Sequence, residues 1–289
     1  MLVTAMADSD TPATQLGVEG RDRDPALKPI LQLLRGACPG DIARGTALSA
    51  AILQRVAAGE LPETARLGRP GRIVTFGRRD AVTPGYPEAL ASARTAGYEV
   101  VERLAGGRAA AYNGESINLS RALRDPNPAR GTQARFAEMA ELVRAALATL
   151  GVDARVGEIP GEYCPGAFSV NARGKLKLAG IGQRLIKGGA HVGCVIVAAG
   201  SGGLREVLVP VYEALGIEWD PATAGSVEDE VAGVTAAEVE AAVLAQLEQR
   251  FELAEAQIDA ETEALAADLA PGHRPRETAL PAAIIPEAT

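Results

Sequence analysis

The stretch Gly161–Gly189, GEYCPGAFSVNARGKLKLAGIGQRLIKGG, holds the residues that organise the interpretation of the whole chain. Cys164 lies between Tyr163 and a Pro-Gly turn, a position that would leave its sulfur accessible at the edge of a strand. Lys177 follows between two leucines, and three of the four lysines of the chain fall in this window. An ammonium group can be desolvated and can lose its proton, which a guanidinium cannot, so lysine is the cation suited to a reactive thiol.

The chain offers few other partners for a nucleophilic cysteine. Its only histidines are His191, which begins an apolar strand, and His273, which lies near the C-terminus. Lys177 is therefore the preferred partner, and the residues alone suggest an acyl-transfer site. The alternatives are ordinary ones: Cys164 would be a small buried hydrophobic residue, and Lys177 an exposed lysine on a strand.

Composition limits the class of protein. The 289 residues carry a net charge of −8 with a pI near 5.0, which argues against a nucleic-acid partner. Apolar runs fall short of the roughly 20 residues of a membrane helix, and the N-terminal sequence lacks the pattern of a signal peptide, so we expect a cytoplasmic protein without membrane contact. The chain has three cysteines, Cys38, Cys164 and Cys194. Their odd number and the absence of a CxxC pair argue against a zinc site or a disulfide framework. We expect no bound metal.

Hydrophobic periodicity predicts an α+β fold, with a mixed, largely antiparallel sheet covered by helices. The expected helices are 31–34, 42–58 (capped by Asp41), 86–96, 134–150 and 204–215. The expected strands are 72–76, 98–104, 116–120, 154–159 and 192–199, with a hairpin around 171–174, whereas 59–70 is expected to be a loop. The chain is divided into a disordered leader (1–24), a catalytic domain (25–232), one long C-terminal helix (233–268) and a flexible tail (269–289).

Gly106 and Gly107 directly follow a predicted strand and are flanked by Arg103 and Arg108. Adjacent glycines allow the backbone to approach a ligand closely, although a simple turn would explain them as well. No Gly-Lys-Ser/Thr follows as in a P-loop, and the glycines at 200–203 lack the context of a dinucleotide fold. We therefore expect no cofactor.

Several segments together resemble the superfamily of lipoate/octanoate transferases and lipoate–protein ligases. Lys177–Arg184 (KLAGIGQR) is similar to its Lys-x-x-Gly-x-(Ala/Ser)-Gln-Arg signature, and Arg103–Ala109 (RLAGGRA) to its Arg-x-x-Gly-Gly-x-Ala segment. Ile117–Ser120 (INLS) matches the strand that follows, and the Tyr163–Gly166 turn (YCPG) looks most like the octanoyl-(glycine cleavage H protein):protein N-octanoyltransferase branch. The resemblance covers about residues 40–230. The chain departs from it at Tyr112, where the family has His, and at Gly182, where it prefers Ser or Ala.

The resemblance implies a fold of the biotin/lipoate ligase and transferase catalytic domain type. It implies that Cys164 carries an octanoyl or lipoyl group as a thioester and that Lys177 stabilises the thiolate and handles the proton, as a Cys-Lys dyad. Acceptors would be lysines of lipoyl-domain proteins, namely glycine cleavage H protein and the E2 subunits of 2-oxoacid dehydrogenases. The residues implied to bind the acyl group are Arg103, Gly106, Gly107, Tyr112, Gly180 and Gln183.

Two alternatives stay open at this point. An ATP-dependent lipoate–protein ligase would share the fold and the lysine, but it would activate the free acid as an adenylate and need no cysteine. A non-catalytic protein that binds acyl groups or lipoyl domains would keep the fold alone. The presence of both Cys164 and Lys177 favours the transferase.

Overall fold

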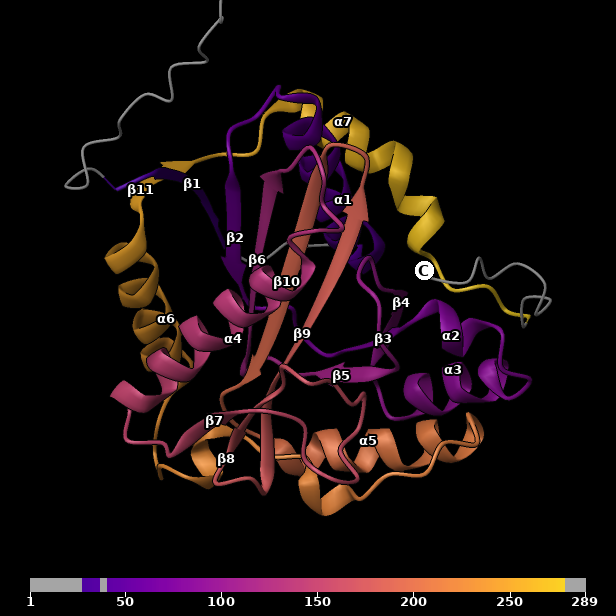
Figure 1. Ribbon diagram of the computed structural model, residues 1–289. Coiled ribbons are helices and arrows are strands. Elements are labelled where there is room, and N and C mark those ends of the chain that lie inside the picture. The colour runs from indigo at the N-terminus through magenta and orange to yellow at the C-terminus, as the bar shows by residue number, and fades with distance from the viewer. Residues whose placement is uncertain (1–27, 37–40, 279–289) are drawn as a thin grey trace, which may run out of the picture.

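The main sheet has eight strands in the order β11-β1-β2-β6-β10-β9-β8-β7 in the computed structural model, which describes residues 28–36 and 41–278 (Figure 1). Strand β1 pairs in parallel with β11 and β2, whereas every other neighbouring pair in this sheet is antiparallel. The predicted mixed, largely antiparallel sheet is therefore confirmed. Its strands are β1 (Ile30–Arg35), β2 (Thr64–Gly68), β6 (Ser116–Arg124), β7 (Ala154–Val156), β8 (Val170–Ala172), β9 (Leu176–Ile186), β10 (Gly189–Val197) and β11 (Glu252–Ala256).

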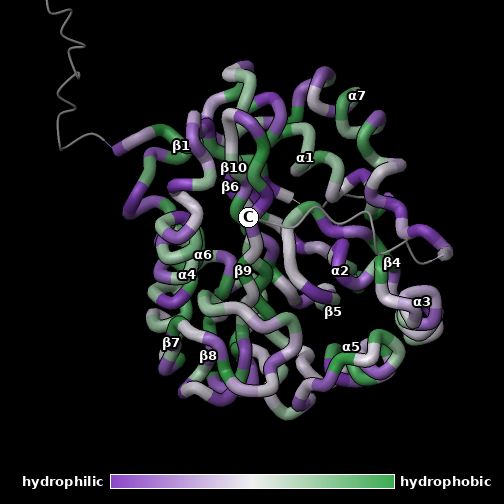
Figure 2. The backbone as a smooth tube through the Cα atoms, turned by 45° about the vertical axis from the view of Figure 1, so that its right-hand side comes forward, coloured by the Kyte–Doolittle hydropathy of each residue, from purple (hydrophilic) through white to green (hydrophobic). Residues whose placement is uncertain are grey.

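Helices cover both faces of this sheet, because alternate residues along its strands are apolar. Leu33 joins the core under α4 (Thr132–Thr149) and α6 (Ala236–Arg250), whereas the next residue, Leu34, packs with α1 (Ile42–Ala58) on the other face. Helix α7 (Ala260–Leu269) packs on α1. Hydropathy alternates along α4 and α5, as expected for helices with one buried side (Figure 2).

A second layer carries the smaller sheet, in the order β4-β3-β5. An aromatic core in which Phe76 meets Tyr86 edge to face joins this sheet to two helices. The elements are β3 (Ile73–Phe76), α2 (Arg78–Ala81), α3 (Tyr86–Thr95), β4 (Glu99–Glu102), β5 (Ala110–Tyr112) and α5 (Ser201–Ala214). Short 3-10 turns occupy Pro221–Thr223, Val227–Asp229 and Ala270–His273.

Two predicted helices are wrong, and both errors lie where segments far apart in the chain pair as strands. Residues 31–34 form part of strand β1, and residues 233–268 form α6, β11 and most of α7 instead of one long helix. Strand β11 adds to β1 in parallel register, Ile30 opposite Glu252, so the two strands stabilise each other across the chain. The Asp259 carboxylate then accepts the Thr262 N–H and starts α7.

The proposed domain boundaries change for the same reason. Helix α6 contributes to the main core and α7 to the core around α1, so residues 233–268 pack against the elements that precede them. The segment 59–70, expected to be a loop, contains β2. The predicted leader, 1–24, lies outside the described residues, and within the predicted tail Ala270–His273 form a 3-10 turn and Glu277 pairs with Arg94.

The predicted start of α1 is confirmed. The Asp41 carboxylate accepts the Ala43 N–H at 3.0 Å.

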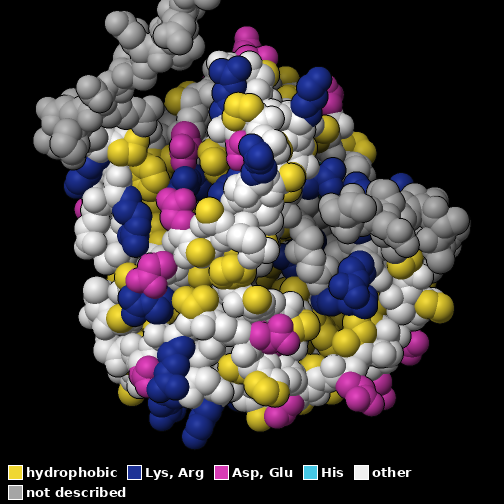
Figure 3. All heavy atoms as spheres, viewed as in Figure 1, with side chains coloured by type: hydrophobic (Ala, Val, Ile, Leu, Met, Phe, Trp, Pro, Cys, Tyr) yellow, Lys and Arg dark blue, Asp and Glu magenta, His cyan; other side chains and the backbone are white. Residues whose placement is uncertain are grey.

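Charged side chains of both signs are scattered over the face shown in Figure 3, with apolar side chains between them. Among the described helices, none is both long enough and apolar enough to cross a membrane.

Candidate active site

Cys164 lies in the loop between β7 and β8, in a backbone conformation that only a few non-glycine residues adopt. Its φ angle is +43°, in the left-handed region, which costs about 1–3 kcal/mol unless the surroundings hold it. The Tyr212 hydroxyl accepts the Cys164 N–H at 2.8 Å and donates to the Ala109 carbonyl at 2.8 Å. Helix α5 therefore fixes the backbone of the cysteine through one buried tyrosine.

The thiol is surrounded by donors from the loop between β4 and β5. The Arg108 backbone N–H donates to Cys164 Sγ at 3.2 Å. The Arg103 guanidinium lies 3.7 Å from the same sulfur and donates to the Arg108 carbonyl at 3.0 Å. The sulfur therefore has one hydrogen-bond donor and one fixed cation within reach.

Gly107 leaves the space that Cys164 Sγ and the Arg103 guanidinium need beside the glycine loop. A Cβ atom at this position would lie 2.9 Å from Cys164 Sγ and 2.8 Å from the Arg103 guanidinium, and its φ angle is +123°. Glycine is the residue that tolerates both conditions. Gly106 has no such contact, and its N–H donates to the Gln183 carbonyl at 3.2 Å.

Lys177 is buried, with 1% of its side chain exposed, and it binds the backbone of the cysteine loop. Its ammonium donates to the Tyr163 carbonyl at 2.9 Å, the Cys164 carbonyl at 2.7 Å and the Glu162 carboxylate at 2.9 Å. It also lies 4.8 Å from the centre of the Tyr163 ring. Since an ammonium has three N–H donors, these contacts use all of them. Lys177 therefore reaches the carbonyl side of Cys164, and the cation beside the thiol is Arg103.

Glu162 is the residue of this site that the sequence interpretation missed. Its side chain is fully buried and accepts hydrogen bonds from the Lys177 ammonium, the Ser169 hydroxyl at 2.6 Å, and the N–H groups of Gly166 at 3.1 Å and Ile159 at 3.2 Å. The Glu162 carboxylate thus connects both ends of the loop between β7 and β8 and, through Lys177, joins that loop to β9. In the sequence, only its position directly before Tyr163 and Cys164 could have pointed to a role in the site, because the sequence does not show that the side chain is buried.

Asp80, at the end of α2, supports the glycine loop. Its carboxylate is fully buried, accepts the Gly77 N–H at 2.8 Å and pairs with Arg108 at 3.2 Å. Burial raises the pKa of Asp80, while the Gly77 N–H and Arg108 oppose that rise. The Arg108 side chain also donates to the Arg79 carbonyl at 3.2 Å. Arg108, whose backbone N–H donates to the thiol, is therefore fixed by its side chain through Asp80 and the Arg79 carbonyl.

A cavity of about 480 Å³ opens in front of Cys164. Stacked Phe136 and Phe168, with ring centres 5.2 Å apart, form part of its wall, together with the aliphatic side chains of Ile181, Leu185, Val195 and Val197. All the residues implied by the resemblance line this one cavity, namely Arg103, Gly106, Gly107, Tyr112, Cys164, Lys177, Gly180 and Gln183. We call it the acyl cavity.

Two of these lining residues contribute mainly through the backbone or through packing. The Gln183 amide donates to the Thr132 carbonyl at 2.8 Å and accepts from Arg135 at 2.9 Å, so its side chain connects β9 to the start of α4. A Cβ atom at Gly180 would lie 3.5 Å from Lys177 Cε, in ordinary contact. Gly180 therefore adds no side chain to the cavity wall beside Lys177.

The other cysteines and histidines take different positions. Cys194 is buried in β10, and burial raises its pKa to about 12, as expected for a small core residue. Cys38 lies outside the described residues. His273 lies away from the acyl cavity and bonds the Glu102 carbonyl. Within residues 28–36 and 41–278, His, Cys, Asp and Glu side chains form no group of three or more that could hold a metal ion.

Comparison with known proteins places this geometry in a family. The family described as lipoyl protein ligase A/B catalytic domain matches residues 41–248. An octanoyl-GcvH:protein N-octanoyltransferase of Geobacillus kaustophilus is 32% identical over 176 residues, which cover 61% of this chain and 62% of the relative. The enzyme of the same name from Bacillus velezensis is 30% identical over 169 residues, 58% of each chain. The match thus spans about three fifths of the length of these relatives.

Solved structures show the same fold. A putative lipoate protein ligase from T. acidophilum with bound lipoic acid superposes with a TM-score of 0.67 at 22% identity, over 85% of this chain and 96% of that chain. A lipoate-protein ligase A bound with ATP gives a TM-score of 0.65 at 21% identity, over 85% and 95%. The fold expected from the sequence is confirmed.

Proposed function

The chain belongs to the lipoyl protein ligase A/B catalytic domain family, and on that premise we propose that it transfers an octanoyl or lipoyl group through a thioester on Cys164 to a lysine of a lipoyl-domain protein. The observation that carries the proposal is the thiol itself. Cys164 Sγ lies at the wall of the acyl cavity with the Arg108 N–H at 3.2 Å and the Arg103 cation at 3.7 Å. The similarity to octanoyl-GcvH:protein N-octanoyltransferases supports the same reaction.

The reaction proceeds in two balanced steps. In the first, the Cys164 sulfur attacks the carbonyl carbon of an acylated lysine on the donor; a C–S bond forms, the C–N bond breaks, and the thiol proton ends on the departing amine. In the second, the amine of the acceptor lysine attacks the thioester; a C–N bond forms, the C–S bond breaks, and the proton returns to the sulfur. Neither step consumes ATP.

We assign the two cations different tasks. Arg103 stabilises the thiolate directly, because its guanidinium is the charge nearest to the sulfur. Lys177 is a positioning residue in the resting site, since it holds the carbonyls on both sides of the Tyr163–Cys164 bond. Its ammonium lies beside Gly180 in the wall of the acyl cavity, where its charge attracts the oxygen of the acyl group while its three N–H donors stay on the cysteine loop.

The cavity suits this chemistry on the substrate side. Gly106, Gly107 and Tyr112 line the same space as the thiol, and its apolar wall includes Phe136 and Phe168. An alkyl chain gains about 0.8 kcal/mol per buried methylene there. We propose glycine cleavage H protein as the donor, and H protein and the E2 subunits of 2-oxoacid dehydrogenases as lipoyl-domain acceptors.

The deciding experiment is intact-mass measurement after incubation with an octanoylated lipoyl domain. We expect an octanoyl adduct on the wild type that hydroxylamine removes, and no adduct on Cys164→Ser. A serine ester would resist hydroxylamine under the same mild conditions, so the two variants are distinguishable. If the wild type forms no adduct, while ATP and free octanoate acylate the lipoyl domain, the protein is a ligase and the transferase proposal is wrong.

A further inference from the structure

The Tyr212 hydroxyl joins the two loops that meet at Cys164. It accepts the Cys164 N–H at 2.8 Å from the loop between β7 and β8, and it donates to the Ala109 carbonyl at 2.8 Å, at the end of the loop between β4 and β5. Ala109 directly follows Arg108, whose N–H donates to Cys164 Sγ at 3.2 Å. These contacts close a ring of hydrogen bonds that contains both the nucleophile and its N–H donor.

The other polar groups in this ring belong to the backbone, apart from the thiol itself. The ring runs from the Tyr212 oxygen to the Ala109 carbonyl and along the backbone to the Arg108 N–H. It then crosses to Cys164 Sγ and returns through the Cys164 N–H. Removing the Tyr212 hydroxyl would therefore open the ring without changing the nucleophile or the N–H donor.

The phenol is held in place on α5 and keeps its proton. Tyr212 is 1% exposed, and its ring packs on Trp219 with ring centres 5.4 Å apart. Trp219 in turn meets the Tyr163 ring edge to face at 5.9 Å, so this aromatic cluster extends to the residue before the cysteine. Burial raises the pKa of Tyr212 well above its usual value. The hydroxyl therefore retains the proton that it donates to the Ala109 carbonyl near neutral pH.

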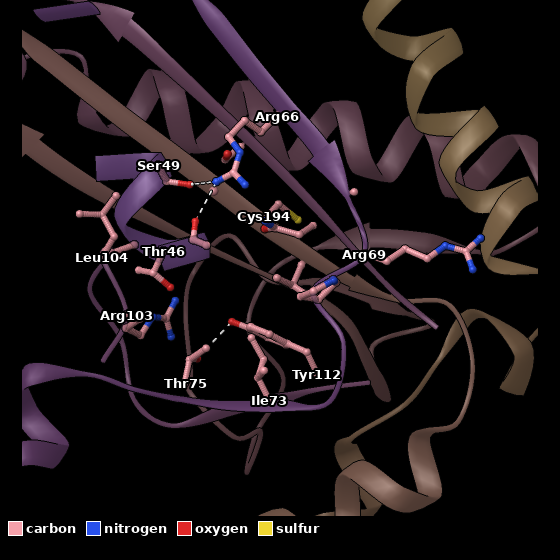
Figure 4. Close-up of a pocket in the computed structure, with 18 of the residues that line it drawn as sticks. Thr46, Ser49, Arg66, Arg69, Ile73, Thr75, Arg103, Leu104, Tyr112 and Cys194 are labelled. Carbon is pink, nitrogen blue, oxygen red and sulfur yellow. Dashed lines mark hydrogen bonds between the residues drawn. The ribbon is translucent and has the colours of Figure 1, made fainter. Parts of the chain in front are cut away.

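Tyr212 lies behind the site and does not contact the space for the substrate. It is not among the residues that line the acyl cavity, whereas Tyr112 lines both that cavity and a neighbouring one of about 160 Å³ (Figure 4). The Thr75 hydroxyl on β3 donates to the Tyr112 hydroxyl at 3.3 Å, the contact drawn in Figure 4. Substitution of Tyr112 is therefore expected to change substrate binding, and substitution of Tyr212 to change the geometry at the sulfur.

The conformation of Cys164 and the chemistry both require such a bridge. A residue held in the left-handed region relaxes when the contacts that hold it are lost. The C–S bond formed in the first step also takes up the sulfur electrons, so the contact between Sγ and the Arg108 N–H weakens. The two contacts of the Tyr212 hydroxyl involve no reacting atom and persist. They keep the Arg108 N–H beside the carbonyl that gains negative charge, where a fixed donor stabilises the transition state.

We propose that Tyr212 is a positioning residue for acyl transfer, whose hydroxyl holds the Cys164 backbone and the Arg108 N–H at a fixed spacing through both steps. This inference rests on the proposed function. It adds to the site a residue of α5 that lies outside the segments on which the family resemblance rests.

The test measures the two steps separately in the wild type, Tyr212→Phe and Tyr98→Phe. Intact mass follows single-turnover loading at increasing concentrations of octanoylated lipoyl domain, and then transfer from isolated octanoyl-enzyme to excess unmodified lipoyl domain. In Tyr212→Phe both maximal rate constants should fall by about tenfold to a hundredfold, because a misplacement of about 1 Å costs up to a hundredfold. The donor concentration that gives half the maximal rate should not change, because Tyr212 does not line the acyl cavity.

Tyr98→Phe is the matched control. Tyr98 is 5% exposed and belongs to the same core, and its hydroxyl donates to the Gly203 carbonyl of α5 at 3.2 Å. This variant removes a buried hydroxyl without opening the ring, so both rate constants should stay at the wild-type values. A purely structural loss would lower the fraction of enzyme that reacts and leave the rate constants unchanged. Unchanged rate constants in Tyr212→Phe, or equal decreases in the two variants, would overturn the proposal.

Amide exchange measured by NMR tests the bridge without the reaction. Cysteine labelled with heavy nitrogen gives one amide signal for each of Cys38, Cys164 and Cys194. We expect slow exchange of the Cys164 N–H in the wild type and about tenfold faster exchange in Tyr212→Phe, which lacks that hydrogen bond. If Tyr212→Phe does not fold, rapid exchange in the wild type would by itself refute the bridge. If the wild type forms no octanoyl adduct, the transferase function fails and the role in transfer with it, whereas faster exchange in Tyr212→Phe would still establish the bridge.

Discussion

Replacing Glu162 by glutamine should destabilise the protein by about 3–5 kcal/mol, because it leaves the Lys177 ammonium buried without its counter-ion. Both side chains are essentially inaccessible to water, so solvent cannot replace the lost charge. Glutamine keeps the shape but would also present an amide N–H₂ to donors at Ser169, Gly166 or Ile159. At about 2–4 °C per kcal/mol, the melting temperature should fall by about 6–20 °C.

The measurement is urea unfolding followed by circular dichroism, with wild type, Glu162→Gln, Lys177→Met and the double variant. We expect the double variant to recover most of the stability that Glu162→Gln loses, since an uncharged buried pair removes the unpaired charge. The same double variant should fail to form the thioester, because nothing then holds the carbonyls of Tyr163 and Cys164. Loss of less than 1 kcal/mol in Glu162→Gln, or no recovery in the double variant, would refute the counter-ion argument.

Three other predictions follow from the same geometry. Asp80→Asn keeps the shape but loses the ion pair with Arg108, so thioester formation should slow by about tenfold with little change in melting temperature; an unchanged rate would show that the pair does not position the N–H donor. Gly107→Ala should slow it by about a hundredfold, because the added Cβ atom meets the nucleophilic sulfur, whereas Gly114→Ala, with nothing within 4 Å, should not; equal rates would contradict the clash. Burial lowers the pKa of His191 to about 4, so the imidazole takes up its proton at a lower pH in the folded state than in the unfolded state, and this residue reduces stability as pH falls from 6.5 to 4. Between pH 7.5 and 5 the wild type should therefore lose about 2 kcal/mol more of its free energy of unfolding than His191→Gln. Equal losses would be inconsistent with a buried neutral ring.

The sequence was informative wherever neighbouring residues decide the outcome. The turn before Pro165, the two glycines at 106 and 107, and the strand that carries Lys177 are local patterns, and the structure brings them to one cavity. Helix α1 was predicted from its cap and its spacing of apolar residues, and it begins and ends as expected. These features needed no knowledge of distant contacts.

The errors concern contacts between segments far apart in the chain. Strand β1 is six residues long and pairs with β2 on one side and, on the other, with β11, more than two hundred residues later. The same pairing interrupts an Ala- and Glu-rich segment that has good helical propensity throughout. Tertiary pairing prevails over local propensity in both places.

Sequence also could not assign the partner of each charge. Lys177 was expected at the thiol because of its chemistry, but the burial of Glu162 directs it to the carbonyl groups instead. Arg103 was expected only in the acyl pocket, and it is the cation nearest to the sulfur.

The conformation of Cys164 explains why so many distant elements converge on one residue. A left-handed φ of +43° is unfavourable for cysteine, so it persists only because the backbone is held on both sides: the N–H by Tyr212, and the carbonyls by Lys177. With the backbone fixed, the side chain reaches the donors at Arg103 and Arg108. Glu162 in turn pairs with Lys177 in a buried site, so the direction of the sulfur depends on an ion pair that does not touch it.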